Sequence, residues 1–220
     1  MFSNGISRYF IKREFEYVRL PFPDDSLSYF EAIKTVSEKF WEESLPNSSV
    51  YGFQAMQNSK WRPGLLDEQI SSFERSIELN FPPPLRNFYK VMNGLTKPGI
   101  NLYGSDGTPF GYQSIFYSYP DDLELIKEKI DWIYSSNLIK HEELESLGAS
   151  RIFPVFQHRF MLIDIPGHPI LSMYGDDIIY WTDNLSKLLA VDVFDKIEDI
   201  RFFQSHPDNR SKINFWLDKD

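Results

Sequence analysis

Cysteine is absent from the 220-residue chain. Disulfide bonds, thiolate zinc sites, iron–sulfur clusters and cysteine nucleophiles are therefore excluded. A chain without cysteine also suits a reducing compartment. Long apolar stretches are absent as well, because no segment approaches the roughly 18 consecutive apolar residues of a membrane-spanning helix.

An export signal is not expected at the start of the chain. Arg8, Lys12, Arg13 and Glu14 interrupt the apolar residues there before they reach the length of a signal-peptide core. We therefore expect a cytoplasmic protein without a membrane partner.

Basic residues are in the minority, since 23 Lys and Arg stand against 32 Asp and Glu, a net charge of −9. Residues 1–100 hold twelve of each, so the surplus of acids lies in residues 101–220, and residues 164–199 alone hold eight acids and two bases. Nucleic-acid binding is not expected, because it requires clustered Lys and Arg. The acidic stretch suits a basic protein partner; the alternative is a solvated surface that maintains solubility.

Aromatic residues are abundant, at 16% of the chain, while the hydrophobic 42% and the charged 25% are near the values of ordinary globular proteins. A chain of this length can bury a core without disulfides or metals. The composition therefore predicts a single folding unit.

Apolar residues recur at helical spacing in several segments. The expected helices cover residues 27–44, 66–77, 82–92, 121–134, 141–147 and 184–193. Ser28 and Glu31 have the spacing of a capping box, Asn93-Gly94 is typical of a helix C-terminus, and Asp183 is expected to cap the last helix.

Strand-like segments follow the helices. Residues 151–156, 159–165, 169–174 and 177–182 are separated by turn residues, and residues 9–20 form a weaker strand pattern. The order predicts an α+β fold, in which helices cover an antiparallel or mixed sheet. Residues 1–60 are expected to be an N-terminal helical extension packed on a main domain of residues 61–220.

The segment around the third helix carries a motif. Its members are Phe73-Glu74, Phe81-Pro82, Leu85, Phe88-Tyr89 and Asn93-Gly94, in a register without gaps. This spacing resembles the first motif of the SUKH superfamily, bacterial immunity proteins that include a yeast cell-wall-assembly regulator. Glu78 and Leu85 depart from the family's Gly and Tyr. Residues 152–156, 162–164, 169–174 and 185–189 resemble the family's second half, so the likeness covers about residues 61–190.

The resemblance implies a binding protein rather than an enzyme. Many SUKH proteins neutralise a toxin, often a nuclease, by covering its active site or a nearby surface. The motif residues Phe73, Glu74, Phe81, Pro82, Phe88, Asn93 and Gly94 would then be structural. Specificity would lie on a variable surface that the motif does not identify.

Acidic and aromatic residues near the last predicted strand form the candidate toxin-binding site. Its members are Asp176, Asp177, Tyr180, Trp181 and Asp183. Tyr and Trp are favoured in interface hot spots, and their faces attract Lys and Arg. Tyr180 and Trp181 lie on opposite faces of a strand, so at least one is expected in the core. The alternative is a core with a solvated rim, and the uncharged segment Phe110–Tyr119 is a second candidate.

Signatures of catalysis and of cofactors are weak. The glycine frame Gly99–Gly104 is followed by Ser105-Asp106, where a phosphate loop needs Lys and Ser or Thr. Asp164 and His168 could join Asp176 and Asp177 around a metal, but turn positions explain these residues better. We therefore expect no metal and no cofactor.

The prediction is an immunity protein that masks a basic toxin by shape and charge. A non-enzymatic scaffold that binds several cellular proteins is the alternative. An enzyme ranks third, because no coherent nucleophile, metal or cofactor signature is found.

Overall fold

The computed structural model describes residues 18–43, 45–46, 52–101, 111–194, 197–205, 213 and 215–217. Its α-helices are α1 (Leu27–Glu43), α2 (Asp67–Ser76), α3 (Pro83–Val91), α4 (Leu123–Ser136), α5 (Leu144–Leu147) and α6 (Leu185–Val193), with short 3-10 helices at His141–Glu143 and Ile200–Phe202. The strands are β1 (Phe53–Gln54), β2 (Trp61–Pro63), β3 (Met92–Leu95), β4 (Gly99–Asn101), β5 (Tyr112–Gln113), β6 (Ile152–Phe156), β7 (Arg159–Leu162), β8 (Ile170–Tyr174) and β9 (Asp177–Thr182).

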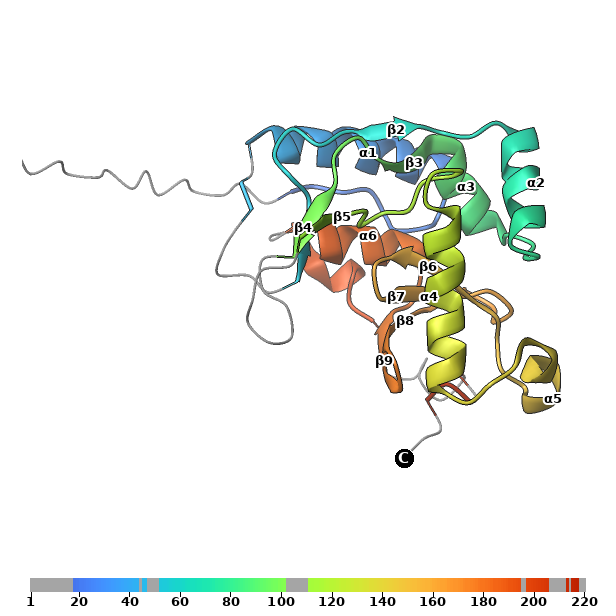
Figure 1. Cartoon of the computed structure of the whole chain (residues 1–220). Helices are drawn as coiled ribbons and strands as arrows, with labels where there is room; N and C mark the ends of the chain where they lie inside the picture. Colours follow the sequence, from blue (N-terminus) through green and yellow to red (C-terminus); the bar gives the residue numbers. More distant parts are fainter. Residues whose placement is uncertain are drawn as a thin grey trace, which may run out of the picture.

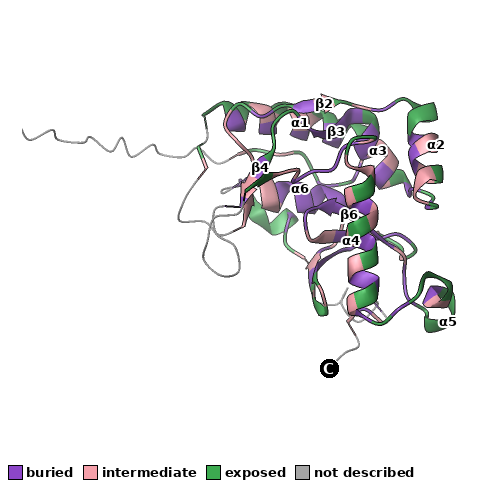
Figure 2. Cartoon of the chain, viewed as in Figure 1, coloured by how far each residue is buried: buried purple, intermediate pink, exposed green. Residues whose placement is uncertain are grey.

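The architecture is α+β, as predicted. The main sheet is an antiparallel meander in the order β6-β7-β8-β9, and two small antiparallel sheets, β1-β4-β5 and β2-β3, accompany it. Figure 1 shows α4 crossing beside the meander, while α6 lies between the meander and α1. Buried positions gather on α3, α6 and β6 at the centre of the molecule (Figure 2).

Helix α1 belongs to this core. Tyr29, Phe30 and Trp41 are almost completely buried, and the Phe30 ring meets Phe88 of α3 edge-on at 5.9 Å. The predicted capping box at Ser28 is wrong: Ser26 caps the helix, since its hydroxyl accepts a hydrogen bond from the amide of Tyr29. The helix begins one residue before Ser28, so only Ser26 can reach that amide.

The motif of α2 and α3 is held together by Glu74. Its carboxylate accepts hydrogen bonds from the amide of Phe81 at 2.8 Å and from Arg86 at 2.6 Å, which joins the turn to both helices. Phe73, Phe81 and Phe88 are buried, as predicted.

Two apolar positions of α2 differ from the prediction. Ile77 is only partly buried, and Leu66 is 66% exposed. Leu66 precedes the helix as its extended N-cap residue. Helical periodicity therefore does not apply to its side chain.

Asn93 and Gly94 do not end a helix, contrary to the prediction. Helix α3 stops at Val91, and the chain continues directly into β3. Between the pairs Trp61–Leu95 and Pro63–Met92 the chain advances two residues along β2 and three along β3, so β3 carries one extra residue, which forms a β-bulge. Gly94 has a φ of +73°, which explains the glycine.

Helix α6 begins with Asn184, whose side chain accepts a hydrogen bond from the amide of Lys187. The predicted cap at Asp183 is therefore wrong. Asp25 ties this helix to α1, because its carboxylate accepts from the amide of Ser186 at 2.7 Å while its own amide donates to the Ser186 hydroxyl at 2.8 Å.

The predicted N-terminal strand, residues 9–20, lies largely outside the described residues. Within them, Val18 forms a single parallel bridge with Ile197. Across the described part of the chain, no helix combines the length and the apolar character needed to cross a bilayer.

Candidate functional site

The five residues of the predicted patch occupy three different environments. Asp176 and Asp177 lie exposed at the turn between β8 and β9. Tyr174 and Ile179 are exposed beside them, at 58% and 50%. We call these four residues the acidic hairpin.

Tyr180 and Asp183 point away from the acidic hairpin into the protein. Tyr180 is 6% exposed, and its hydroxyl donates a 2.5 Å hydrogen bond to Asp183. Asp183 also forms an ion pair with Lys187, and both side chains of this pair are nearly buried. Tyr180 is thus the core aromatic that strand alternation requires, and Asp183 contributes little to the surface charge.

Ion pairs neutralise most of the described acids in the acidic stretch. Within residues 164–199, Asp164 pairs with Arg151, Asp183 with Lys187, Asp192 with Arg159 and Glu198 with Arg19. Asp199 lies 3.7 Å from Arg201. Among the described acids of this stretch, only Asp176 and Asp177 have no ion-pair partner.

Helix α4 supports the acidic hairpin. The Trp132 ring meets the Tyr174 ring edge-on at 5.3 Å, and the Lys129 ammonium lies over the Trp132 ring at 5.5 Å from its centre. The Asn137 amide donates a 3.0 Å hydrogen bond to the carbonyl of Gly175. These contacts fix the turn in one place relative to the sheet.

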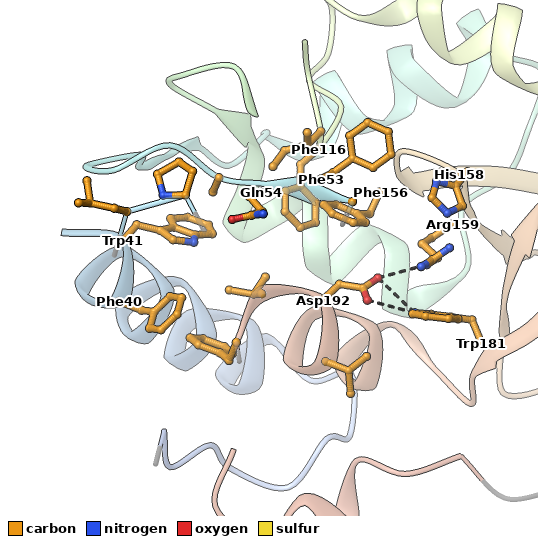
Figure 3. Close-up of a pocket in the computed structure, with 18 residues that line it drawn as sticks. Phe40, Trp41, Phe53, Gln54, Phe116, Phe156, His158, Arg159, Trp181 and Asp192 are labelled. Carbon is orange, nitrogen blue, oxygen red and sulfur yellow. Dashed lines mark hydrogen bonds and ion pairs between the residues drawn. The ribbon is translucent and has the colours of Figure 1, made fainter. Parts of the chain in front are cut away.

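Trp181 lies in a separate feature, which we call the aromatic cleft. The cleft has a volume of about 280 Å³ and lies between α1, α6, β1 and the adjoining ends of β6 and β7 (Figure 3). Its apolar lining consists mainly of Phe40, Trp41, Phe53, Phe116, Phe156, Val191 and Phe194. Aromatic rings thus cover opposite sides of the cleft. The charged groups Arg159 and Asp192 lie at one end, while the amide of Gln54 lies near Trp41 (Figure 3).

The polar end is a buried network. Asp192 accepts hydrogen bonds from the Trp181 indole at 3.2 Å and from Nε of Arg159 at 3.3 Å, as Figure 3 shows. The Arg159 guanidinium stacks over the Trp181 ring at 3.5 Å and donates to the Ser172 hydroxyl at 2.5 Å. Only 12% of the Arg159 side chain and 9% of the Asp192 side chain are exposed.

Burial shifts the titration of this network. Desolvation raises the pKa of Asp192 to about 6, although Arg159 and Trp181 act in the opposite direction. Desolvation, together with the nearby charges of Arg159 and Lys129, lowers the pKa of His158 to about 4. At neutral pH His158 is uncharged, and the Arg159–Asp192 pair has no net charge.

Sequence reasoning did not identify Arg159, Asp192 or His158. One signal was present, because Asp192 follows Leu188, Leu189 and two further apolar residues in a helix that is otherwise largely buried. A carboxylate in such a run requires a partner. The sequence does not reveal that the partner lies 33 residues earlier, on β7.

Asp164 and His168, the candidates for a metal site, do not form one among the described residues. Asp164 accepts hydrogen bonds from Arg151, and no group of three metal-ligating side chains occurs in the part of the chain that the structure describes. Nδ1 of His168 is buried and has no hydrogen-bond partner among the described residues.

The segment Phe110–Tyr119 begins with a residue outside the described ranges. Phe116 and Tyr117 are buried and Tyr119 stacks on Phe73 at 4.6 Å, whereas Gly111 and Tyr112 are exposed, Tyr112 at 65%. The second half of this segment therefore belongs to the core.

Comparison with known proteins gives no relative: no family model, curated protein or solved structure matches the chain. The likeness to the SUKH superfamily rests on the sequence patterns within residues 61–190 alone.

Proposed function

We propose that the protein is a cytoplasmic, non-catalytic immunity protein of the SUKH type, which binds and neutralises a basic toxin. The acidic hairpin is the part of its surface that meets the partner. The sequence motif from Phe73 to Gly94 supports the family assignment, since Phe73, Phe81 and Phe88 are buried and Glu74 links the turn to Arg86.

One observation carries the proposal. Asp176 and Asp177 are adjacent, exposed and without ion-pair partners among the described residues, whereas the other described acids of residues 164–199 have bases nearby. Two uncompensated carboxylates on a supported turn attract a basic surface over a distance of about one Debye length, roughly 8 Å at physiological salt.

The exposed side chains of Tyr174 and Ile179 add contact area for a partner, which the two carboxylates alone do not provide. Tyr174 offers a flat face with a polar tip, and Ile179 adds apolar area. Interfaces gain most of their affinity from such anchors, and rim charges mainly raise the association rate. Because Trp132 and Asn137 hold the turn, little conformational entropy is lost on binding.

The test is a charge reversal at the hairpin, Asp176→Lys with Asp177→Lys. Glu142→Lys with Glu145→Lys is the matched control, since both glutamates are exposed outside the acidic hairpin, on the 3-10 helix His141–Glu143 and on α5, and the control changes the net charge equally. The partner protein is the product of the neighbouring reading frame. Cell survival on co-expression and association kinetics at low and high salt are measured.

We expect the hairpin variant to lose protection and to associate at least about tenfold more slowly at low salt, while the control keeps both. Circular dichroism confirms that each variant is folded. Full protection by a folded hairpin variant would exclude this surface. Binding of several unrelated proteins, without protection from any toxin, would favour the scaffold alternative.

A further inference from the structure

The aromatic cleft is a second site beside the acidic hairpin, since the ring of its lining residue His158 meets the Tyr174 ring edge-on at 6.4 Å. The ion pair of the cleft is the starting point. Removing two charges from water is unfavourable by several kcal/mol per ion, and a buried pair rarely adds net stability over apolar side chains of the same volume. The pair of Arg159 and Asp192 nevertheless lies at the end of an open cleft. A buried polar network in this position is typical of a binding site.

The charge of the polar end selects against ions. Arg159 and Asp192 cancel each other, and His158 is neutral at pH 7. A charged ligand would lose its hydration without meeting an opposite net charge among the residues that line the cleft. The site therefore suits a neutral ligand.

The lining selects a flat ring. Phe40 and Trp41 come from α1 on one side, while Phe53 and Phe156 lie across from them (Figure 3). Aromatic faces on two sides favour a planar aromatic guest, which stacks with little loss of conformational entropy.

The polar end of the cleft determines which hydrogen-bonding groups the edge of the bound ring must carry. Asp192 can accept a further hydrogen bond, because a carboxylate has about four lone-pair sites and the three contacts with Arg159 and Trp181 leave about one of them free. Nε and Nη1 of Arg159 donate to Asp192 and Ser172, and Nη2 has no hydrogen-bond partner among the residues that the structure describes. A donor and an acceptor are thus offered side by side.

We infer that the aromatic cleft binds a neutral purine ring, as a free nucleobase or nucleoside. A purine presents adjacent donors and acceptors at its edge, as in N6 and N7 of adenine or N1 and O6 of guanine. An indole has only a donor and leaves Arg159 unsatisfied. Proteins that hold a single base combine the same two elements, stacking and hydrogen bonds to the edge of the base.

The experiment titrates the full chain with adenosine, guanosine and indole, using calorimetry and tryptophan fluorescence. We expect saturable binding of at least one nucleoside, about tenfold or more tighter than that of indole. Equal binding of indole would overturn the inference and would point to a partner's aromatic side chain. No saturable nucleoside binding would overturn it as well.

Two variants test the location. Val191→Phe adds a ring to the cleft from α6 and keeps both members of the ion pair, and we expect it to abolish binding. Leu27→Phe, outside the cleft at the exposed start of α1, is the matched control and should bind normally. Asp192→Asn should weaken nucleoside binding about tenfold and leave indole binding unchanged. Nucleoside binding that survives Val191→Phe in the folded protein would exclude this cleft. The result is independent of the toxin proposal, whose test uses other residues.

Discussion

Phe88 shows how one side chain joins the helices of the core. It is 1% exposed and meets Phe30, Trp61 and Tyr89 edge-on, at ring distances between 5.1 and 6.0 Å. Replacement by alanine removes these contacts and leaves a cavity, so Phe88→Ala should lower the free energy of unfolding by about 3–5 kcal/mol. Urea denaturation measures this change.

Phe22 provides the control for that prediction. It is 69% exposed and contacts Phe202 at 6.2 Å. Phe22→Ala should change the free energy of unfolding by less than about 0.5 kcal/mol. Equal effects of the two substitutions would contradict the assignment of Phe88 to the core.

His158 makes the stability depend on pH. Its pKa is lowered from 6.5 to about 4 in the folded protein, so between these values the unfolded chain binds a proton that the folded chain does not. The stabilisation from neutral His158 is therefore present above pH 6.5 and is lost as the pH falls through about 4. The difference in free energy of unfolding between the wild type and His158→Gln should shrink over this range.

Asp192 has to be separated from this effect. Its pKa is raised from 3.8 to about 6, so its own contribution is full below pH 3.8 and is lost as the pH rises through about 6. The two groups act in opposite directions, but Asp192 is present in both proteins and its contribution largely cancels in the difference. A difference that stays constant from pH 7 to pH 4 would show that His158 is not desolvated.

At the scale of an element, the bulge of β3 explains one glycine. A Cβ atom on Gly94 would lie 2.7 Å from Cβ of Ser118, and the residue has a φ of +73°. Gly94→Ala should therefore destabilise the protein by more than the roughly 1–2 kcal/mol of an alanine at positive φ. Gly148, with a φ of +63° and open space around it, is the control for the backbone term alone.

Thermal melting compares the two alanine variants. Gly94→Ala should lower the melting temperature clearly more than Gly148→Ala, because only the first substitution adds a steric clash. Equal shifts would mean that the segment around Ser118 moves aside without loss.

The sequence predicts elements well where the period is regular. The four strands of the meander and α1 agree with the prediction to within a few residues, because alternation and helical periodicity are local properties. Boundaries are less predictable. Ser28, Asn93 and Asp183 have the right residue types for helix caps. Ser26 and Asn184 cap the helices in place of Ser28 and Asp183, and Asn93 lies in the strand β3. The helix boundary depends on the path of the chain beyond the helix, which the residue type alone does not show.

At the scale of the whole molecule, α1 determines whether residues 61–220 form an independent domain. Trp41 meets Trp61 at 5.5 Å, and the Tyr29 hydroxyl donates to the carbonyl of Ser186. Removal of α1 would expose the apolar faces of α3 and α6. A chain limited to residues 61–220 should therefore lack a cooperative unfolding transition, as measured by circular dichroism and urea denaturation. A cooperative transition in that chain would show that residues 1–60 are a dispensable extension.

The candidate sites were predictable from the sequence only in part, because the residues of the aromatic cleft lie far apart along the chain. Asp176 and Asp177 lie where a hairpin turn places them, and turns are exposed. The aromatic cleft combines residues from α1, β1, β7 and α6, which are separated by most of the chain. No local pattern states that Arg159, Trp181 and Asp192 meet.

The hydrogen bonds between Asp25 and Ser186 have a consequence during synthesis of the protein. They join the start of the first helix to the start of the last, so α1 remains without part of its cover until α6 has been made. At roughly 5 to 20 residues per second, a ribosome needs several seconds or more to produce residues 44–184. Throughout that interval the part of α1 that meets the α6 region, with Tyr29 and Phe40, is available to chaperones and to other nascent chains. The final packing of this core therefore has to follow, rather than accompany, most of translation.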